Sequence, residues 1–272
     1  MISALTIPEI DVRNPEIDVR NLCVLVTAGA SGIGRTIAES FVAAGAKVHV
    51  TDVVESTLAA TIDAVPGLTG TIGDASRAED VDRVVVDVSA RFGGLDLLVN
   101  NAGIAGPTGR VDELTAADVD RTIDVNLKSQ FYFLERFVPF LKDSKRNPSI
   151  IGMSSVAGRV GYGFRTPYSA TKWAIVGLVK SLAIELGPLG VRANAILPGG
   201  VQGPRMDRVI AARAEAMGLS FEEMRNEFLR KISLRRMVEA KDVANLALFL
   251  ASDLARNISG QVISVDGNTE SA

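Results

Sequence analysis

The sequence has almost none of the residues that most often act as catalytic bases, thiol nucleophiles or metal ligands: its 272 residues include one cysteine and one histidine. Cys23 lies in the apolar run 22–26 and has no second thiol for a disulfide, so we expect a buried, unreactive side chain. His49 lies in another apolar run, 47–51. With one residue of each type, we predict no metal site and no Ser–His or Cys–His catalytic pair.

Blocks of basic residues and long apolar segments are missing as well. The 29 basic and 32 acidic residues give a net charge of -3, so neither nucleic acid nor an anionic membrane is an expected partner. No stretch of about twenty residues is apolar enough to span a bilayer. The polar, acidic N-terminus lacks the pattern of a signal peptide. We therefore expect a soluble, cytoplasmic protein.

The N-terminus contains a repeat, because the seven residues 8–14 recur unchanged at 15–21. Two copies are too few for a solenoid, and Pro8 and Pro15 exclude one continuous helix. We expect residues 1–21 to form a loosely held arm; pairing of this arm with a neighbouring subunit is a second interpretation.

From Leu22 onward, short apolar runs alternate with helical patterns. The predicted strands are 22–27, 47–51, 68–73, 95–99, 149–153, 191–196 and 262–265. The predicted helices end near 44 and cover 55–64, 77–92, 116 to the 140s, 166–186 and 240–251, with a charged helical insertion at 205–231. Strands that are apolar at every position are buried on both faces. The alternation, with no linker, predicts that residues 22–272 form one doubly wound α/β domain of the Rossmann type, with a seven-stranded parallel sheet and helices on both faces.

A glycine-rich turn, Thr27–Gly34, joins the first strand to the first helix. Glycines allow a sharp turn and a close approach to a pyrophosphate, whose charge lies at the helix N-terminus. The turn therefore predicts a dinucleotide site. Its expected cofactor-binding residues are Gly29, Ser31, Gly32, Ile33 and Gly34.

Asp52 ends the second strand, eighteen residues after Gly34. A carboxylate there accepts hydrogen bonds from the adenosine ribose and repels a 2′-phosphate, which predicts NAD rather than NADP. No arginine directly follows Asp52, although Lys47 and Arg35 leave a compensating cation open.

Tyr168 and Lys172 lie one helical turn apart on the same face of a predicted helix. A free phenol has a pKa of about 10, and a nearby ammonium lowers it toward the range needed for proton transfer. Ser155 lies thirteen residues earlier at a strand end, where ligands gather in open α/β sheets.

Together these features resemble the short-chain dehydrogenase/reductase family, from about Leu22 to Gly267. The resemblance depends on several motifs that follow strands in the expected order. Besides the glycine turn, they are Asp74, Asn100–Gly103, Asn126, Ser154–Ser155, Tyr168 with Lys172, and Pro198–Gly199.

The resemblance implies a role for each matched residue. Tyr168 would exchange a proton with the substrate oxygen, Lys172 would hold the nicotinamide ribose, and Ser155 would bond the reacting oxygen. Asn126 would hold a water that relays protons. The further cofactor contacts that it implies are Asp74 and Ala75 near the adenine, Asn101 and Gly103 beside the adenosine ribose, and Val201 at the nicotinamide carboxamide.

Two residues depart from the family pattern. Ala28 replaces a usual glycine, and we expect it to keep a negative φ in a modified turn. Gly203 replaces a usual threonine and removes one hydroxyl contact to the carboxamide.

The family resemblance also implies a substrate lid, at residues 204–233, and a homotetramer. Family members commonly associate through long helices, and four aromatic side chains either line that interface or belong to the core. They are Phe131, Phe133, Phe137 and Trp173. The lid is expected to be a solvated helical pair, with Gln202, Tyr162 and Phe164 as pocket walls. An alternative is that Arg159, Arg165, Arg205 and Arg208 meet an anionic substrate.

The predicted function is oxidation of a secondary alcohol to a ketone, and the reverse, with NAD and a small-molecule substrate such as a sugar, polyol or hydroxy acid. An alternative is reduction of a 3-oxoacyl thioester, which more often uses NADPH and is therefore disfavoured by Asp52. A non-catalytic nucleotide-binding scaffold is a third hypothesis. It is disfavoured because Asn126, Ser155, Tyr168 and Lys172 are all present.

Overall fold

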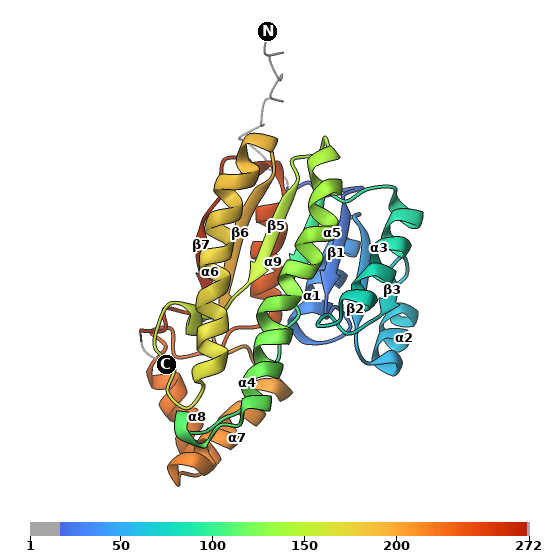
Figure 1. Ribbon diagram of the computed structural model, residues 1–272. Helices are drawn as coiled ribbons and strands as arrows, with labels where there is room; N and C mark the ends of the chain where they lie inside the picture. Colours follow the sequence, from blue (N-terminus) through green and yellow to red (C-terminus); the bar gives the residue numbers. More distant parts are fainter. Residues whose placement is uncertain (1–16, 271–272) are drawn as a thin grey trace.

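Seven short strands form one parallel sheet in the computed structural model, which describes residues 17–270 (Figure 1). They are β1 (Cys23–Thr27), β2 (Lys47–Asp52), β3 (Thr69–Ile72), β4 (Leu97–Asn100), β5 (Ser149–Met153), β6 (Arg192–Pro198) and β7 (Val262–Val265). Their order is β3-β2-β1-β4-β5-β6-β7, and every neighbouring pair is parallel. This order confirms the doubly wound Rossmann-type sheet predicted from the apolar strands.

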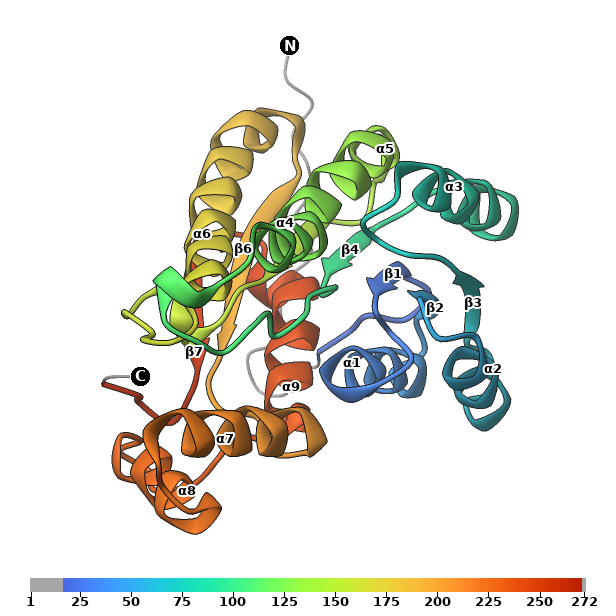
Figure 2. The ribbon, with the colours of Figure 1, turned by 60° about the horizontal axis from the view of Figure 1, so that its bottom comes forward.

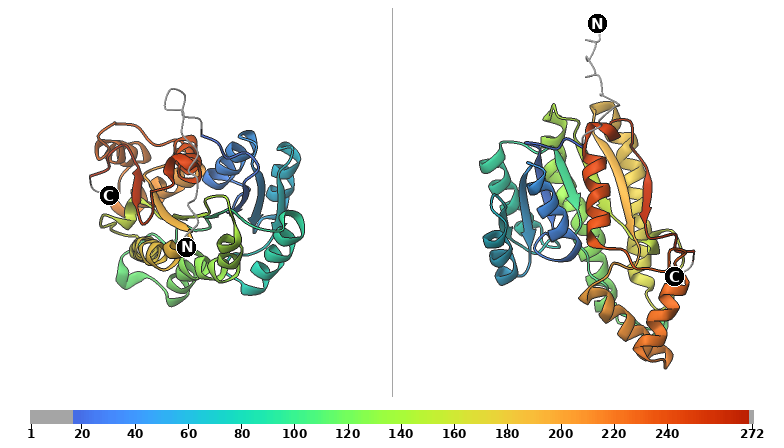
Figure 3. Two further views of the ribbon diagram at one scale, coloured as in Figure 1. Left: turned by 90° about the horizontal axis from the view of Figure 1, so that it is seen from above. Right: turned by 180° about the vertical axis from the view of Figure 1, so that it is seen from behind.

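Helices cover both faces of the sheet (Figure 3). One face carries α3 (Ala78–Phe92), α5 (Ser129–Asp143) and α6 (Thr166–Leu186), and the other carries α1 (Gly32–Ala43), α2 (Glu55–Ala64) and α9 (Ala240–Ala251). A separate hydrophobic core lies between the sheet and the helices on each face. Phe133 and Phe137 are fully buried in one of them and stack with ring centroids 6.1 Å apart. Phe131 and Trp173 are instead half exposed, so these two alone among the four predicted aromatics are free for an interface.

The crossover direction reverses between β1 and β4, which is the point at which such folds bind ligands. The carboxyl ends of β1, β4, β5 and β6 face the same edge. Two helices of the predicted lid segment, α7 (Pro204–Met217) and α8 (Phe221–Arg230), extend beyond that edge at the bottom of Figures 1 and 2. The predicted charged insertion is therefore a helical pair at the end of the sheet that carries the site.

The long helix predicted from 116 to the 140s is interrupted. It consists of α4 (Ala116–Ile123), a π-helical segment (Asp124–Lys128) and then α5. Single π-helical turns of this kind are frequent at functional sites, because they turn one residue out of the regular helical repeat. Here the segment contains Asn126, whose contacts are described below.

Residues 1–16, which hold the first copy of the repeat and the start of the second, lie outside the described residues. The expected loose arm does not extend through residues 17–21. Val19 is 1% exposed within the hydrophobic core, and Arg146 donates hydrogen bonds to the carbonyls of Arg20 and Asn21. Burial of the apolar Val19 side chain in this core explains why this part of the repeat packs against the domain.

The single cysteine and the single histidine lie on neighbouring strands. Cys23 on β1 is only partly buried, whereas a buried side chain was expected. His49 is fully buried on β2, where Thr69 and Thr71 bond its two ring nitrogens at 2.8 and 2.9 Å. Within residues 17–270 no helix is both long and apolar enough to cross a membrane.

Candidate active site

The predicted proton-transfer pair lies at the start of α6. Tyr168 and Lys172 face the carboxyl end of β5, and the Lys172 ammonium lies 5.6 Å from the centroid of the Tyr168 ring. Lys172 is 3% exposed and donates a 2.8 Å hydrogen bond from Nζ to the carbonyl oxygen of Met153, the last residue of β5. The helical i, i+4 spacing brings the two side chains together, and the strand end fixes the ammonium.

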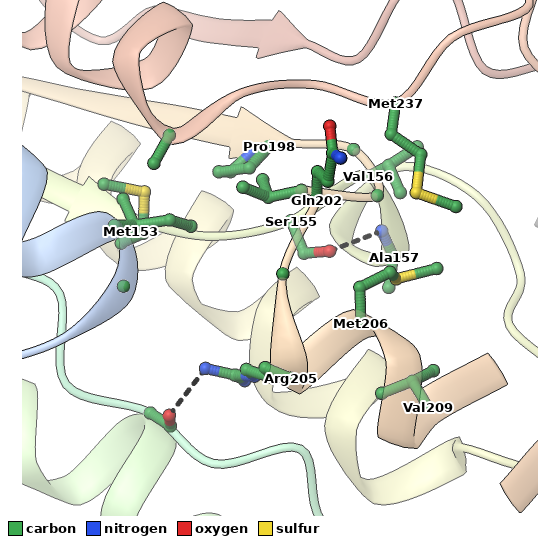
Figure 4. Close-up of a pocket in the computed structure, with 18 of the residues that line it drawn as sticks. Met153, Ser155, Val156, Ala157, Pro198, Gln202, Arg205, Met206, Val209 and Met237 are labelled. Carbon is green, nitrogen blue, oxygen red and sulfur yellow. Dashed lines mark hydrogen bonds between the residues drawn. The ribbon is translucent and has the colours of Figure 1, made fainter. Parts of the chain in front are cut away.

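Ser155 follows β5 and begins a short 3₁₀-helix. Its hydroxyl accepts a 3.2 Å hydrogen bond from the Ala157 N–H (Figure 4). The same hydroxyl lies within hydrogen-bonding reach of the Tyr168 side chain and lowers its pKa. The neighbouring Ser154 lies elsewhere, since its hydroxyl donates to the Lys172 carbonyl oxygen at 2.7 Å. Of the two serines, Ser155 is thus the one beside the phenol.

The charges around Tyr168 favour its phenolate form. Burial by itself raises the Tyr168 pKa, but Lys172, Arg205, the Ser155 hydrogen bond and Arg165 together lower that pKa below its usual 10. Burial also lowers the pKa of Lys172 to about 8, against the opposing attraction of Tyr168. Both groups therefore titrate closer to neutral pH than they do in water, as proton transfer requires.

Asn126 holds the loop after β4 against α6. Its Oδ1 accepts a 2.7 Å hydrogen bond from the Ile104 N–H, while Nδ2 donates to the Ile104 carbonyl and to Thr171 Oγ1. A Cβ added at Gly103 would lie 3.3 Å from Asn126 Oδ1 and 3.4 Å from Lys172 Nζ. The π-helical segment thus places the Asn126 amide and the Lys172 ammonium on either side of the same point at Gly103.

The glycine turn between β1 and α1 is tightly built. A Cβ at Gly34 would come within 2.5 Å of Asn101 Nδ2, and one at Gly29 within 2.5 Å of Val50. Asn101 donates from Nδ2 to the carbonyls of Thr27 and Ala28, so its amide group ties the turn to the end of β4. Gly32 has a φ of 52° and open space where a Cβ would lie, which leaves the first turn of α1 accessible.

The expectation of a negative φ at Ala28 is wrong, because its φ is 51°. This turn requires the left-handed conformation at the position where a glycine is usual, and the alanine methyl does not change that requirement. The close contacts of Gly34 and Asn101 with the Ala28 carbonyl hold the residue in this conformation.

Three of the predicted adenosine contacts, Asp52, Asp74 and Ala75, lie outside the wall of the cavity described below. Asp52 is 8% exposed, and its two carboxylate oxygens accept hydrogen bonds from the N–H groups of Ala30 and Val54. Asp74 follows β3 and is bonded by Ser76 and Arg121. Burial by itself raises the Asp74 pKa, but the bonds from Ser76 and Arg121 outweigh this effect, so the pKa lies below its usual value. Ala75 packs against the core beside α3.

A cavity of about 450 Å³ connects the glycine turn with the proton-transfer pair, a size typical of small-molecule sites. Its wall includes many of the predicted residues. These are Ser31, Gly32, Ile33, Gly34, Asn101, Gly103, Ser155, Tyr168, Lys172 and Val201. Gln202 and Tyr162 line it as expected, and Phe164 does not. Met206 and Met237 cover Ser155 from the lid side (Figure 4).

The four arginines considered for an anionic substrate differ in their surroundings. Arg159 donates to Asp266 Oδ2 at 2.6 Å and to the Thr269 carbonyl, so its charge is already paired. Arg205 reaches across the cavity and donates to the Gly103 carbonyl at 3.0 Å (Figure 4). Arg208 is exposed on α7.

Arg165 is the one of the four that is buried. It is 3% exposed, and its guanidinium lies 4.5 Å from the centroid of the Tyr168 ring and 5.5 Å from that of Tyr162. Arg213 lies on the Tyr162 ring as well, at 5.2 Å. Sequence reasoning missed this stack, along with the Met153 and Thr171 contacts. The spacing of Arg165 three residues before Tyr168 was the one available signal.

Comparison with known proteins agrees with this geometry. A family model described as Enoyl-(Acyl carrier protein) reductase matches residues 27–268. The levodione reductase of Leifsonia aquatica is 32% identical over 265 residues, which cover 95% of this chain and 98% of that protein. The chain belongs to the short-chain dehydrogenase/reductase family.

Other members of the short-chain dehydrogenase/reductase family match over similar lengths. The D-beta-hydroxybutyrate dehydrogenase of Rhizobium meliloti (strain 1021) is 34% identical, with 89% of this chain and 96% of that protein covered. The crystal structure of levodione reductase superposes with a TM-score of 0.85 at 31% identity, over 91% of this chain and 98% of the other. A 3-ketoacyl-(acyl-carrier-protein) reductase from Brucella melitensis, complexed with NADH, gives 0.82 at 27% identity, over 93% and 99%. This chain is therefore an oxidoreductase with the family's fold.

Proposed function

We propose that this short-chain dehydrogenase/reductase interconverts a secondary alcohol and a ketone with NAD as the cofactor. The observation that carries the proposal is the Tyr168 phenol, which lies within reach of Ser155 and beside the buried Lys172, in a cavity that continues to the glycine turn. In the oxidative direction the substrate carbon loses a hydride and its hydroxyl loses a proton. The products are a ketone, NADH and a proton.

The residues of the chain perform the proton-transfer half of this reaction. The Ser155 hydroxyl bonds and orients the substrate oxygen, and the Tyr168 phenolate accepts its proton. Lys172 stabilises the phenolate, while Asn126 positions the loop and helix that surround the ammonium. The nicotinamide, when bound, supplies the hydride acceptor. The glycine turn suits such a cofactor because its close packing at Gly34 admits no side chain and leaves the α1 N-terminus open to a pyrophosphate.

A preference for NAD over NADP follows from Asp52. Its carboxylate is held at the end of β2 by the Ala30 and Val54 N–H groups, where it would repel a 2′-phosphate. Of the two cations that left the choice open, Lys47 begins β2 at its opposite end and Arg35 is paired with Glu39. The NADH named for the Brucella melitensis structure supports the same choice.

The substrate is proposed to be a small secondary alcohol, from the sugar, polyol or hydroxy acid classes. The name of the Rhizobium meliloti relative supports a hydroxy acid. Reduction of a 3-oxoacyl thioester remains the second candidate, supported by the name of the Brucella melitensis structure and disfavoured by Asp52. We also propose a cytoplasmic homotetramer, for which the half-exposed Phe131 on α5 and Trp173 on α6 supply apolar contact surface.

The first experiment measures kcat/KM with NAD and NADP over polyols, sugars, hydroxy acids and simple secondary alcohols. With the best substrate, Tyr168→Phe is expected to lower kcat at least about 1000-fold, because the ring keeps its place but loses the group that accepts the proton. NADH affinity, measured by fluorescence titration, is expected to change less than about twofold. Tyr132→Phe, on α5 and outside the cavity wall, is the matched control with full activity. Turnover retained by Tyr168→Phe would refute the proposed role.

A further inference from the structure

The wall of the catalytic cavity carries a charge imbalance. Five cationic side chains line it, and no aspartate or glutamate does so among residues 17–270, although the whole chain has a net charge of -3. The five are Arg165, Lys172, Arg205, Arg208 and Lys231. A pyrophosphate at the glycine turn would lie at the other end of the cavity. An oxidised nicotinamide would add one more positive charge next to Lys172.

Arg165 is the most deeply buried arginine of the cavity wall, and no carboxylate pairs with it in the described part of the chain. Its Nη2 donates to the Ala105 carbonyl at 2.5 Å, but Nε is buried without a hydrogen-bond partner in the described part of the chain. Burial lowers the pKa of its guanidinium, and the charges that act on it are the phenols of Tyr162 and Tyr168 and two further arginines. A cation that is removed from water without a carboxylate is strongly unfavourable.

The Tyr162 and Tyr168 rings hold the Arg165 guanidinium in place by cation–π contacts. Such contacts fix its orientation but do not neutralise it. Arg159, six residues before Arg165, provides the contrast, since its charge is paired with Asp266. An anion supplied from outside the chain would give Arg165 the counter-charge that Arg159 already has.

We propose that the substrate carries a carboxylate a few bonds from the carbon that is oxidised, and that Arg165 is the residue that recognises this carboxylate. This deepens the function proposed above and rests on it. One face of the Tyr168 ring carries Arg165, and the hydroxyl of that same ring meets the substrate oxygen, so the two substrate groups lie close together. That spacing corresponds to a 2- or 3-hydroxy acid, or to the matching oxo acid.

The rest of the cavity favours an apolar remainder over a sugar or polyol chain. Besides Arg205, Arg208 and Lys231, the wall near the lid consists of thioether and hydrocarbon groups. These residues are Val156, Met206, Val209, Phe228, Ile232 and Met237. Apolar walls with one charged group at the end fix a small acid in one orientation, with the carboxylate on Arg165 and the hydrocarbon part toward the lid.

A different role for Arg165 is to lower the Tyr168 pKa without touching substrate. The two roles are separated by pairs of substrates that differ only in charge. We suggest 2- and 3-hydroxy acids compared with their primary amides, because a role through Tyr168 affects both members of a pair equally. Salt concentration is held constant, since it screens the acid alone.

The wild-type enzyme is expected to oxidise the best acid at least about 100-fold more efficiently than its amide, measured as kcat/KM. Arg165→Gln is expected to lose about 100-fold with the acid, mostly in KM, and less than about fivefold with the amide. Arg213→Gln is the matched control, because Arg213 is also a buried arginine on the Tyr162 ring but is absent from the cavity wall. It is expected to keep the ratio of acid to amide.

Three results would overturn the proposal. They are a wild-type enzyme with no preference for the acid, an equal loss for acid and amide in Arg165→Gln with a shifted pH profile, and a preference for phosphate-bearing alcohols over hydroxy acids. Thermal unfolding would reveal whether Arg165→Gln fails to fold. Even in that case, the comparison of acid and amide with the wild-type enzyme tests whether the substrate carries a carboxylate.

A binding measurement distinguishes failure of this inference from failure of the proposed function. The probes are 2- and 3-methoxy acids, which have no hydroxyl proton to lose, titrated by calorimetry into the complex with NAD. Binding that is at least about 30-fold weaker in Arg165→Gln supports carboxylate recognition even if no alcohol is turned over. Equal binding in both proteins contradicts it even if turnover is high.

Discussion

Replacement of Lys172 by methionine should abolish activity and at the same time stabilise the protein. The ammonium is 3% exposed, and its burial lowers the Lys172 pKa from 10.5 to about 8. At about 1.4 kcal/mol for each pH unit, keeping this group charged at neutral pH costs about 3 kcal/mol of the free energy of unfolding. Methionine has a similar length and no charge. It loses the hydrogen bond to the Met153 carbonyl, worth about 1 kcal/mol, so the net gain is about 2 kcal/mol.

The sign of the pH dependence follows from the direction of the pKa shift. The folded wild-type protein releases the Lys172 proton near pH 8, and the unfolded chain releases it near pH 10.5. Between these values the unfolded chain holds more protons, so the stability of the wild type rises with pH. Lys172→Met lacks this group. Its advantage of about 2 kcal/mol near pH 7 should therefore fall to about zero near pH 9.5.

The assay is urea unfolding of the cofactor-free protein, followed by circular dichroism at about pH 7 and about pH 9.5. Lys180→Met is the control, because Lys180 is an exposed lysine on the same helix. It should change the free energy of unfolding by less than about 0.5 kcal/mol at either pH. A Lys172→Met protein that is less stable than the wild type at pH 7, or that gains equally at both pH values, would show that burial of the ammonium carries no such cost.

Three further predictions concern the turn, the paired arginine and the phenol. Ala28→Gly should raise the free energy of unfolding by about 1 kcal/mol, seen as about 2 °C in thermal unfolding, because glycine adopts a φ of 51° without strain; a loss of stability would mean that the methyl packs favourably. Arg159→Ala should lower the free energy of unfolding by about 2 kcal/mol, because it leaves Asp266 buried without its partner, and should keep the ratio of acid to amide turnover; an unchanged urea midpoint would contradict the pairing. The pH profile of kcat/KM for alcohol oxidation should rise through an apparent pKa below 10, and Arg205→Gln should move it upward, because Arg205 lowers the Tyr168 pKa; a profile that stays in place would exclude this effect.

The sequence by itself determined the features that depend on neighbours along the chain. Strand residues such as 22–26 are apolar at every position, which sufficed to predict a sheet buried on both faces and hence its parallel, doubly wound form. The glycine turn follows from the strand and helix that flank it. The shared face of Tyr168 and Lys172 follows from the period of one helix. The predicted ends of the helices and strands differ from the observed ends by only one or two residues, which is the usual uncertainty in assigning such ends.

Only the tertiary structure decided the features that depend on contacts between distant residues. The π-helical segment could not be predicted, because it depends on the bonds of Asn126 to Ile104 and Thr171, 22 and 45 residues away. The same holds for the arginines, which look alike in sequence. Arg159 is paired with Asp266, 107 residues away, whereas Arg165 is buried on Tyr168 with no carboxylate partner in the described structure. Burial and pairing set the energy of a charge, and both are properties of the folded chain.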